Sequence, residues 1–483
     1  MFRYKTPPYA HQEEALRRSY DKKNYAYFME MGCGKSKVLI DNIVWLYDIG
    51  HIDTAIIIAP KGVYRNWELS EIPAHMPDHV DYRVDVWKPS PNKAEKEKLM
   101  EGATEQRKRL RILLINVEAF GSTTKKLSLY LASYIDNCKF MLAVDESTTI
   151  KNPKAKRTKN IIQFGKQAGY KRILTGSPVT KSPMDLFSQC EFMDKSLLNH
   201  DSYWSFQGRY AVTRTQKMGN HSFQMIVGYR NLEELSEKLD KFSFRVTKEQ
   251  ALDLPDKIYT TRGVSLTDEQ LEYYVSLKNV AVALLEGGDL VSAPAVMTQL
   301  LRLQQVLCGH VMTDDGELVE IPSRRIDALL DTIEEMQGKI IIWSRFRYDI
   351  KKIAKVLKDK FGEGSAVTFF GDTTDNERQN AIESFERGEA RFFVANPQTA
   401  GRGLTLNAAT NVIYYSNDFN LETRMQSEDR CHRIGQHNKV LYVDLVCRGT
   451  VDVHIVKTLQ GKIKISAATL GEKVKEWLRI PTK

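Results

Sequence analysis

The sequence lacks long apolar runs, and its cysteines form no recognisable framework. The longest apolar stretches, such as 55–59 and 340–343, are far too short to cross a bilayer, and the first fifteen residues lack the apolar core of a secretory signal. Six cysteines are scattered without a C-x-x-C pair, as is usual in a reducing compartment. These absences predict a protein of the cytoplasm, of the host cytoplasm if the chain is viral, with no membrane contact.

Sulfur-based metal binding is also poorly supported. Cys308 and His310 could begin a zinc site, but no second pair follows at ligand spacing. The end of a helix is the better interpretation of these two residues. The chain also has no internal repeat and no low-complexity tract.

What the chain has is length and a slight excess of basic residues. With 483 residues, 42% hydrophobic and 27% charged, it can bury a large core, and the length suggests two to four domains. Lys and Arg exceed Asp and Glu by 70 to 61, which gives a net charge of +9. That excess favours a polyanionic partner without identifying one.

Short apolar runs alternate with amphipathic stretches in both halves, the pattern of buried strands in parallel sheets. The predicted strands are 25–29, 55–59, 112–117, 141–144 and 172–174 in the first half, and 339–343, 366–370, 392–395, 412–415 and 440–446 in the second. Between the halves, over 186–333, helical periodicity replaces the strand signal. Asn231 with Glu234, and Thr267 with Gln270, predict two capped helices there.

These patterns predict an α/β chain with two parallel-sheet lobes and a helical insert. The first lobe is expected over 1–250, with a helical protrusion over about 187–245. The second is expected over 251–483, with a helical part over about 266–335. The proline in the sequence LDLPDK places the linker at about 251–258.

The segment MGCGKS at 31–36 lies between a predicted strand and a predicted helix, where a triphosphate can bind. Backbone N–H groups can bind the phosphate oxygens, a lysine can neutralise charge, and a hydroxyl can bind Mg²⁺. The full G-x-x-x-x-G-K-[ST] pattern would have glycine at Met29, so this is a shortened version. The predicted ATP-binding residues are Gly32, Cys33, Gly34, Lys35 and Ser36.

Two carboxylates, Asp145 and Glu146, end a predicted strand, at the sheet edge where ligands of α/β proteins bind. Asp145 can hold Mg²⁺ together with Ser36, and Glu146 can orient or deprotonate the attacking water. An isolated Asp-Glu pair would more often be a solvated strand end. The phosphate loop upstream makes the catalytic interpretation the better one.

Two arginines occur close together near the C-terminus, in the segment QSEDRCHRIGQ at 426–436. Arg430 and Arg433 can stabilise charge on a transferring phosphoryl group, an effect worth about 10³ to 10⁵ in rate where such arginines operate. Alone they would be surface arginines. With the phosphate loop almost 400 residues away, they predict two lobes that close on one nucleotide.

At these residues the chain resembles the helicase-like ATPases of superfamily two, and within them the SWI/SNF-related branch of double-stranded DNA translocases, in a compact stand-alone phage or bacterial form. The resemblance runs nearly end to end. The segments that carry it are PYAHQEEAL, EMGCGKS, APKGVYRNW at 59–67, VDESTTIKNP at 144–153, LTGSP at 174–178, RVTKEQALDLPDK at 245–257, IIWSRF at 341–346, QTAGRGLTL at 398–406 and QSEDRCHRIGQ.

The resemblance implies two RecA-like lobes of the P-loop type and assigns roles to further residues. It implies that Gln12 contacts adenine, that Gly403 and Gln426 belong to the nucleotide site, and that Thr175 and Ser177 couple hydrolysis to nucleic acid. The DNA contacts that it implies are Lys61, Asn66, Lys151, Asn152, Arg345, Thr399 and Gly401.

Three positions depart from the family pattern. Thr148 stands where many relatives carry histidine, and Met29 replaces an acidic residue common before the phosphate loop. Arg402 adds a cation between Gly401 and Gly403. The change at Thr148 affects the expected details of coupling rather than the expectation of hydrolysis.

Phosphate contacts carry no sequence information, so DNA binding is expected to be sequence-independent and sensitive to salt. In the helical insert, aromatic and basic side chains alternate and can stack on DNA, although such aromatics are more often packing. They are Tyr203, Trp204, Phe206, Arg209, Tyr210, Arg214 and Lys217. The basic run 151–159 follows the acidic segment directly and is expected to face DNA rather than to act as a nuclear signal.

The resulting hypothesis is a monomeric, DNA-dependent ATPase that moves along duplex or branched DNA, in fork remodelling, branch migration or recombination and repair, with targeting left to a protein partner. An RNA helicase would use the same ATP chemistry. An ATP-gated DNA clamp would bind without turnover. A motor subunit of a defence or restriction assembly would need its partner.

Overall fold

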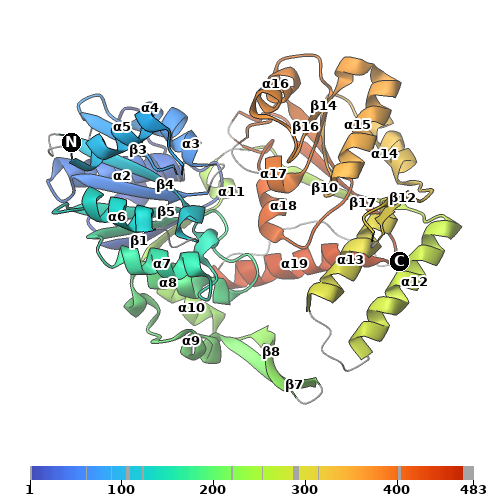
Figure 1. The fold of residues 1–483 in the computed structure, drawn as a ribbon, viewed down its shortest axis with the longest axis horizontal. Coiled ribbons are helices and arrows are strands. Elements are labelled where there is room, and N and C mark those ends of the chain that lie inside the picture. The colour runs from blue at the N-terminus through green and yellow to red at the C-terminus, as the bar shows by residue number, and fades with distance from the viewer. Residues whose placement is uncertain are drawn as a thin grey trace. The chain divides into compact units, whose positions relative to one another are not determined.

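The computed structural model describes residues 3–60, 63–88, 90–104, 109–121, 125–218, 221–252, 254–286, 293–313, 315–400, 404–433 and 435–471. Contacts divide the chain into two compact units. The first comprises Met1–Ala211, Tyr229–Asp253 and Ile465–Lys473, and the second comprises Val212–Gly228, Leu254–Lys464 and Val474–Lys483. Each unit contains one large parallel sheet with helices around it (Figure 1).

The first unit is built on a seven-stranded parallel sheet in the order β3-β4-β2-β5-β6-β1-β9. Its strands are β1 (Asn24–Met29), β2 (Thr54–Ala59), β3 (Tyr82–Val86), β4 (Leu110–Asn116), β5 (Phe140–Asp145), β6 (Tyr170–Leu174) and β9 (Ser243–Val246). Its longer helices are α1 (Ala10–Ser19), α2 (Lys35–Asp48), α5 (Lys93–Thr104), α6 (Lys125–Tyr134), α7 (Lys156–Gly165), α8 (Leu186–Met193), α9 (Tyr203–Tyr210) and α10 (Leu232–Asp240).

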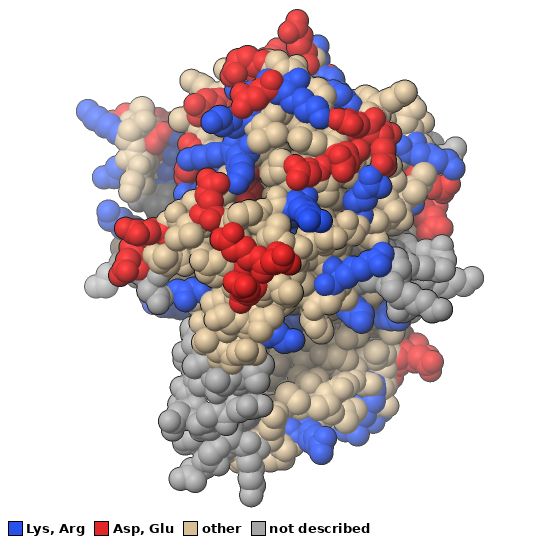
Figure 2. All heavy atoms as spheres, turned by 90° about the vertical axis from the view of Figure 1, so that its right-hand side faces the viewer, with Lys and Arg blue, Asp and Glu red and all other residues tan. Residues whose placement is uncertain are grey.

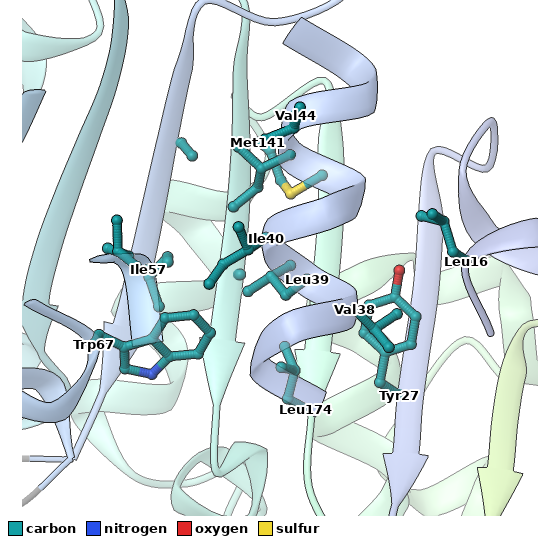
Figure 3. Packing of buried hydrophobic residues seen from close by; sticks show 14 of the residues in the cluster. Leu16, Tyr27, Val38, Leu39, Ile40, Val44, Ile57, Trp67, Met141 and Leu174 are labelled. Atoms are coloured by element: carbon teal, nitrogen blue, oxygen red, sulfur yellow. The ribbon is translucent and has the colours of Figure 1, made fainter. Parts of the chain in front are cut away.

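The core on one face of this sheet is made by α2 and the central strands. Figure 3 shows α2 lying along the sheet, with apolar side chains packed against those of the strands, among them Val38, Leu39, Ile40, Val44, Ile57, Met141 and Leu174. Each fully buried side chain of this size stabilises the fold by about 1.5–3 kcal/mol. This packing fixes the start of α2, and with it the loop between β1 and α2.

The second unit is built on a six-stranded parallel sheet in the order β10-β17-β16-β13-β15-β14. Its strands are β10 (Lys257–Val264), β13 (Lys339–Trp343), β14 (Ala366–Phe369), β15 (Phe392–Ala395), β16 (Ala409–Tyr414) and β17 (Val440–Cys447). Its helices include α12 (Asp268–Glu286), α13 (Ala293–Leu307), α14 (Arg325–Glu334), α15 (Arg347–Phe361), α16 (Asp375–Glu386), α17 (Pro397–Ala400), α18 (Leu421–Glu428) and α19 (Val451–Thr469).

All ten strands predicted from apolar runs are present, and the two-sheet α/β fold is confirmed. Three strands of the large sheets escaped prediction because they are short or polar. In β3, for example, Arg83 and Asp85 interrupt the apolar pattern, and the structure pairs them at 2.9 Å. No helix in the described ranges is long and apolar enough to span a bilayer.

The expected change from strands to helices over 186–333 is only partly correct, because strands occur there beside the helices. That stretch contains β9, β10 and two small antiparallel ribbons, β7 (Ala211–Met218) with β8 (His221–Tyr229), and β11 (His310–Met312) with β12 (Leu318–Glu320). Thr267 and Gln270 form the predicted capping box, with reciprocal bonds of 3.2 Å. Asn231 does not cap α10, because its backbone is left-handed and its amide instead donates to the Arg209 carbonyl at 2.9 Å.

Candidate functional site

The predicted phosphate loop lies between β1 and α2, at the carboxyl edge of the first sheet. Gly32 and Gly34 have φ values of 83° and 80°, in the left-handed region that favours glycine. A Cβ added at Gly34 would lie 2.1 Å from the side-chain nitrogen of Gln12, so this position also needs the absence of a side chain. The loop leads into the N-terminus of α2, whose N–H groups are suited to an anion.

Gln12 and His11, on α1, lie against this loop. The Gln12 amide donates to the Cys33 carbonyl at 3.3 Å, and His11 Nε2 lies 2.9 Å from the same oxygen. The Gln12 oxygen accepts from the Tyr9 backbone N–H at 3.0 Å. The residue expected to contact adenine is therefore held beside the phosphate loop by backbone bonds at both ends of its amide.

Lys35 and Ser36 form the first turn of α2. Lys35 Nζ donates to the Met29 carbonyl at 3.0 Å and to the Glu30 carbonyl at 3.4 Å. Its charge also acts on Asp145, because it is one of the groups that lower the pKa of that carboxyl. The lysine and the acidic residue thus share one site, as a triphosphate site requires.

Asp145 is buried at the end of β5. One oxygen, Oδ2, accepts from the indole Nε1 of Trp67 at 2.8 Å, and Oδ1 accepts from the Glu146 backbone N–H at 2.9 Å. Burial raises the pKa of Asp145, while the Trp67 hydrogen bond and the Lys35 charge oppose that rise. A cation at this carboxylate would act in the same direction as Lys35.

Glu146 follows with an uncommon backbone. Of the four non-glycine residues with positive φ in the described ranges, three are asparagines and the fourth is Glu146, at φ 47°. Holding such a residue in the left-handed region costs about 1–2 kcal/mol. Strained residues of this kind gather at functional sites, so the backbone supports a special role for Glu146.

The residues present fit ATP with Mg²⁺. Glycines 32 and 34 leave room for phosphate, Lys35 supplies a cation, and Ser36 and Asp145 supply oxygens. In the part of the chain that the structure describes, no cluster of three or more His, Cys, Asp or Glu side chains could hold a metal ion alone. Mg²⁺ commonly binds through one or two protein oxygens plus substrate phosphates, which agrees with this arrangement.

The predicted coupling residues Thr175 and Ser177 lie beside the phosphate loop. The Thr175 N–H donates to the Tyr27 carbonyl in β1, and Ser177 N–H donates to Thr175 Oγ1, both at 3.2 Å. A Cβ added at Gly176 would lie 3.0 Å from the Met31 backbone nitrogen, so the two loops are in close contact. Movement of this segment would therefore displace the phosphate loop directly.

The arginine segment lies in the second unit, at the end of α18. Arg430 is 3% exposed, and its guanidinium donates to the carbonyls of Gln426 at 2.8 Å and Leu404 at 3.0 Å. Arg433 donates to the same Leu404 carbonyl at 3.2 Å and to Thr405 Oγ1 at 2.8 Å. The Gln426 side chain is also buried and donates to Glu422 at 3.3 Å.

The candidate DNA contacts of the first unit follow β2 and β5. Asn66 donates to Glu71 at 2.9 Å, Lys151 donates to Thr180 at 2.6 Å, and the Asn152 oxygen accepts from the Lys154 N–H at 3.0 Å. Lys61 lies outside the described residues.

The candidate contacts of the second unit cluster after β13 and β15. The Arg345 backbone is bonded to Ser416 at 2.9 Å and to Asn396 at 2.8 Å, and the Thr399 N–H donates to the Asn396 carbonyl at 3.1 Å. A pocket of about 250 Å³ is lined by Leu301, Gln305, Arg345, Phe346, Asn396, Pro397, Gln398 and Asp418. Gly401, Arg402 and Gly403 lie outside the described residues.

The aromatic stacking hypothesis for the insert is wrong for two of its members. Phe206 and Tyr210 are fully buried, and their rings pack together at 4.8 Å. Trp204 is 68% exposed and keeps its stacking role as a prediction. Figure 2 shows one face of the molecule, on which lysine and arginine are interspersed with aspartate and glutamate rather than gathered into one basic surface.

Three residues near the candidate groups were missed by sequence reasoning. Trp67 lies inside the segment APKGVYRNW, but its hydrogen bond to Asp145 was not predicted. Gln189 is buried and connects Ser147, at 2.7 Å, with the Pro178 carbonyl, at 2.9 Å. Glu428 binds Arg424 at 2.8 Å. No pattern in the sequence indicates which buried polar residues meet.

Comparison with protein families gives two matches. The model of the SNF2-related domain matches residues 11–312, and the model of the helicase conserved C-terminal domain matches residues 324–435. The segment 31–36 lies inside the first match, and residues 426–435 of the arginine segment lie inside the second.

Individual relatives are distant and longer. Protein CHROMATIN REMODELING 4 of Arabidopsis thaliana is 26% identical over 95% of this chain, which spans 21% of that protein. An uncharacterized ATP-dependent helicase of Mycoplasma genitalium is 25% identical over 92% of this chain, which spans 40% of that protein. The SWI2/SNF2 ATPase core of Sulfolobus solfataricus, solved in complex with dsDNA, has 23% identity and a TM-score of 0.41, covering 97% of this chain and 95% of that one.

Proposed function

Since this chain belongs to the SNF2-related family, we propose that it hydrolyses ATP and uses the energy to move along duplex or branched DNA. The observation that carries the proposal is the phosphate loop itself. Two left-handed glycines, Lys35 and the carboxylates of Asp145 and Glu146 meet at one edge of the first sheet. Each residue type that triphosphate hydrolysis needs is present there.

In this proposal the N–H groups at the start of α2 and Lys35 bind the phosphates. Lys35 exchanges its contacts with the carbonyls of Met29 and Glu30 for phosphate oxygens. Ser36 and Asp145 would hold Mg²⁺, which would supply positive charge to the phosphates. Gln12, fixed beside the loop, recognises adenine.

Glu146 orients the attacking water and accepts its proton. Asp145 is the last residue of β5, whereas Glu146 has a left-handed backbone, so two adjacent carboxylates can take different roles. Positioned general bases contribute about 10² to 10⁴ in rate. Replacing Glu146 by Gln should therefore remove turnover while retaining nucleotide binding.

Arg430, Arg433 and Gln426 act on the same nucleotide during turnover. Arg433 is the better candidate for direct contact with phosphate, because it donates to a carbonyl and a hydroxyl at a partly exposed position. Arg430 is buried and bonded to two carbonyls, which suits a residue that also holds the segment in shape.

The finer role that we propose is remodelling of branched DNA, in fork remodelling, branch migration or recombination and repair, by a monomer. It is supported by the candidate contacts in each unit, which follow the carboxyl ends of strands β2, β5, β13 and β15. Such contacts with phosphates would be independent of sequence and weakened by salt.

The test is steady-state ATP hydrolysis without nucleic acid and with single-stranded DNA, linear duplex, forked DNA, four-way DNA or RNA, across a salt series. We expect stimulation by duplex or branched DNA that weakens with salt and is absent in Glu146→Gln. Stimulation by RNA alone would favour an RNA helicase. DNA binding without turnover would favour a clamp, and low activity restored by a partner would favour a subunit of a defence or restriction assembly.

A further inference from the structure

Trp67 begins a π-helix, Trp67–Glu71, immediately after the short helix α3 (Tyr64–Asn66). π-Helical turns are rare, and they are often found at functional sites. The segment follows β2, which pairs with β5 so that Ile58 lies opposite Val144. The chain leaving β2 is therefore brought to Asp145, the residue after Val144.

The indole of Trp67 reaches Asp145 from the core. Trp67 is 1% exposed, and its ring lies beside Ile57 (Figure 3). Its Nε1–H donates to Asp145 Oδ2 at 2.8 Å. Among the described residues, Trp67 is the one side chain that donates a hydrogen bond to this carboxylate, since the other donor is the Glu146 backbone.

The same short segment carries a candidate DNA contact. Asn66 precedes Trp67, and its amide donates to Glu71, at the end of the π-helix, at 2.9 Å. Glu71 is also close enough to Asp145 to act on its charge. A shift of the 63–71 segment would therefore move both the Trp67 donor and the Glu71 charge relative to Asp145.

We propose that Trp67 is a positioning residue that fixes Asp145 for Mg²⁺ and transmits DNA contact at Asn66 to the metal-binding carboxylate. This inference rests on the proposed function, which supplies the roles of Asp145 and Asn66. Hydrogen-bond partners of metal-binding groups typically change metal affinity by about 10- to 100-fold when they are removed. An effect of that size is expected here.

The matched pair of variants is Trp67→Phe and Trp343→Phe. Both remove an indole from a fully buried site, but in the described part of the chain Trp343 Nε1 has no hydrogen-bond partner. Binding of a fluorescent ATP analogue is measured in EDTA and across a Mg²⁺ series, with and without linear duplex DNA. We expect Trp67→Phe to need about 10- to 100-fold more Mg²⁺, with unchanged affinity in EDTA.

DNA should shift the Mg²⁺ midpoint of the wild type and of Trp343→Phe, but not that of Trp67→Phe. In an Asp145→Asn background, the Trp67 substitution should have little further effect on the midpoint. Equal Mg²⁺ midpoints for Trp67→Phe and Trp343→Phe would overturn the inference. So would a Trp67 effect of undiminished size in the Asp145→Asn background.

A wild-type measurement covers the case in which Trp67→Phe does not fold. Protein labelled with 5-fluorotryptophan should show a ¹⁹F resonance that shifts with ATP and Mg²⁺ together and is unmoved in Asp145→Asn. No shifted resonance at saturation would contradict the inference. A wild type that neither binds nor hydrolyses ATP would instead contradict the proposed function.

Discussion

The phosphate loop of the first unit and the arginine segment of the second unit are built in opposite ways. The loop is held mainly through backbone groups, by left-handed glycines and by lysine bonds to carbonyls that a phosphate can replace. Arg430 and Arg433 of the arginine segment also bind carbonyls, but the helix that leads into the segment, α18, is held by buried charges. Arg424 is bonded to Asp444 at 2.9 Å and to Glu428 at 2.8 Å, and all three side chains are buried.

In the proposed ATPase, this difference predicts that the phosphate loop exchanges contacts while helix α18 keeps its own. Bonds to exposed or partly buried carbonyls can be exchanged at small cost, whereas separating buried ion pairs is expensive. These three residues, Arg424, Asp444 and Glu428, form a charge network that also contacts the start of β10. Glu428 accepts hydrogen bonds from Lys257 at 3.2 Å and from Tyr259 at 2.6 Å. Within the second unit, the arginine segment is therefore fixed to the strand that follows the linker.

The first unit anchors the other end of that connection to the phosphate loop. The Lys248 N–H donates to Glu30 at 2.8 Å, and Arg245 lies 3.7 Å from Glu30. Arg245 also donates to the Gly176 carbonyl at 2.9 Å, in the predicted coupling segment. Each end of the linker is thus bonded to residues beside the candidate nucleotide segments of its own unit.

The largest expected effect comes from breaking the charge network. Arg424→Leu leaves Asp444, which is completely buried, without its main counter-charge, and also removes a guanidinium 3.4 Å from the Tyr414 ring. Removing one partner of a buried pair typically costs about 3–5 kcal/mol in the free energy of unfolding. Urea denaturation followed by fluorescence measures it.

The control for this prediction is Arg262→Ala, which breaks the ion pair between Arg262 and Glu335. The two side chains of this pair are 40% and 62% exposed. Exposed pairs contribute little, about 0–1 kcal/mol. Similar losses for the two variants would show that the network of the second unit is not the rigid element inferred from the comparison.

The next prediction concerns pH. A buried carboxylate in each unit should make stability depend on pH, with opposite signs in the two units. In α2, burial raises the pKa of Asp41 to about 6 against the opposing Lys37, which lies at 2.7 Å. The folded state therefore binds this proton more tightly than the unfolded state, so the contribution to stability is lost as pH rises through about 6. The resulting change in the free energy of unfolding is at most about 3 kcal/mol, at 1.36 kcal/mol per pKa unit.

Glu428 has the opposite sign. Burial would raise its pKa, but the Lys257 and Arg424 charges and hydrogen bonds from Tyr259 and Arg424 lower it overall. Its contribution is present above its unfolded pKa and lost as pH falls. Unfolding of wild type, Lys37→Gln/Asp41→Asn and Glu428→Gln is compared between pH 3 and 8. The differences from wild type should have opposite slopes, between about pH 4 and 6 for the Asp41 pair and below about pH 4.5 for Glu428. Slopes of one sign would remove the contrast.

The sequence predicted the parts of both units that depend on local pattern. The ten apolar strands and the segments 31–36, 145–146 and 426–436 are each continuous in sequence, so periodicity and motif spacing reveal them. The Trp67 bond to Asp145 joins residues 78 positions apart, and the Tyr259 bond to Glu428 joins residues 169 apart. Such pairs depend on strand order, which no local pattern encodes.

Asn231 shows that a local pattern can also predict a contact that the fold does not form. Its sequence predicts a helix cap, yet the chain adopts a left-handed backbone there because the side chain finds the Arg209 carbonyl instead. Asparagine tolerates that conformation better than most residues. A local preference was therefore replaced by a contact with a residue 22 positions away.

A smaller effect tests the glycine architecture of the phosphate loop. Gly34→Ala and Gly50→Ala both place a side chain in the left-handed region, at φ 80° and 71°, and each should cost about 1–2 kcal/mol in stability. At Gly50 an added Cβ meets nothing within 4 Å, whereas at Gly34 it meets Gln12.

Only Gly34→Ala should therefore weaken nucleotide binding, by about tenfold, because Gln12 loses its place on the Cys33 carbonyl. Thermal unfolding measures the shared cost, and titration with a fluorescent ATP analogue measures the difference. Equal nucleotide affinity in the two variants would mean that Gln12 does not need its observed position.

The smallest expected effect concerns the link between the arginine segment and β10. Tyr259→Phe removes the hydroxyl that donates to Glu428 at 2.6 Å, while Lys257 and Arg424 still compensate the carboxylate. The loss in the free energy of unfolding should be about 1 kcal/mol, the value of one hydrogen bond whose acceptor stays satisfied. Combined with Glu428→Gln, the tyrosine substitution should cost clearly less than it does alone, because residues that share one bond are not additive. Full additivity in this double-mutant cycle would show that the Tyr259 hydroxyl does not couple β10 to Glu428, which would leave Lys257 as the contact between β10 and the arginine segment.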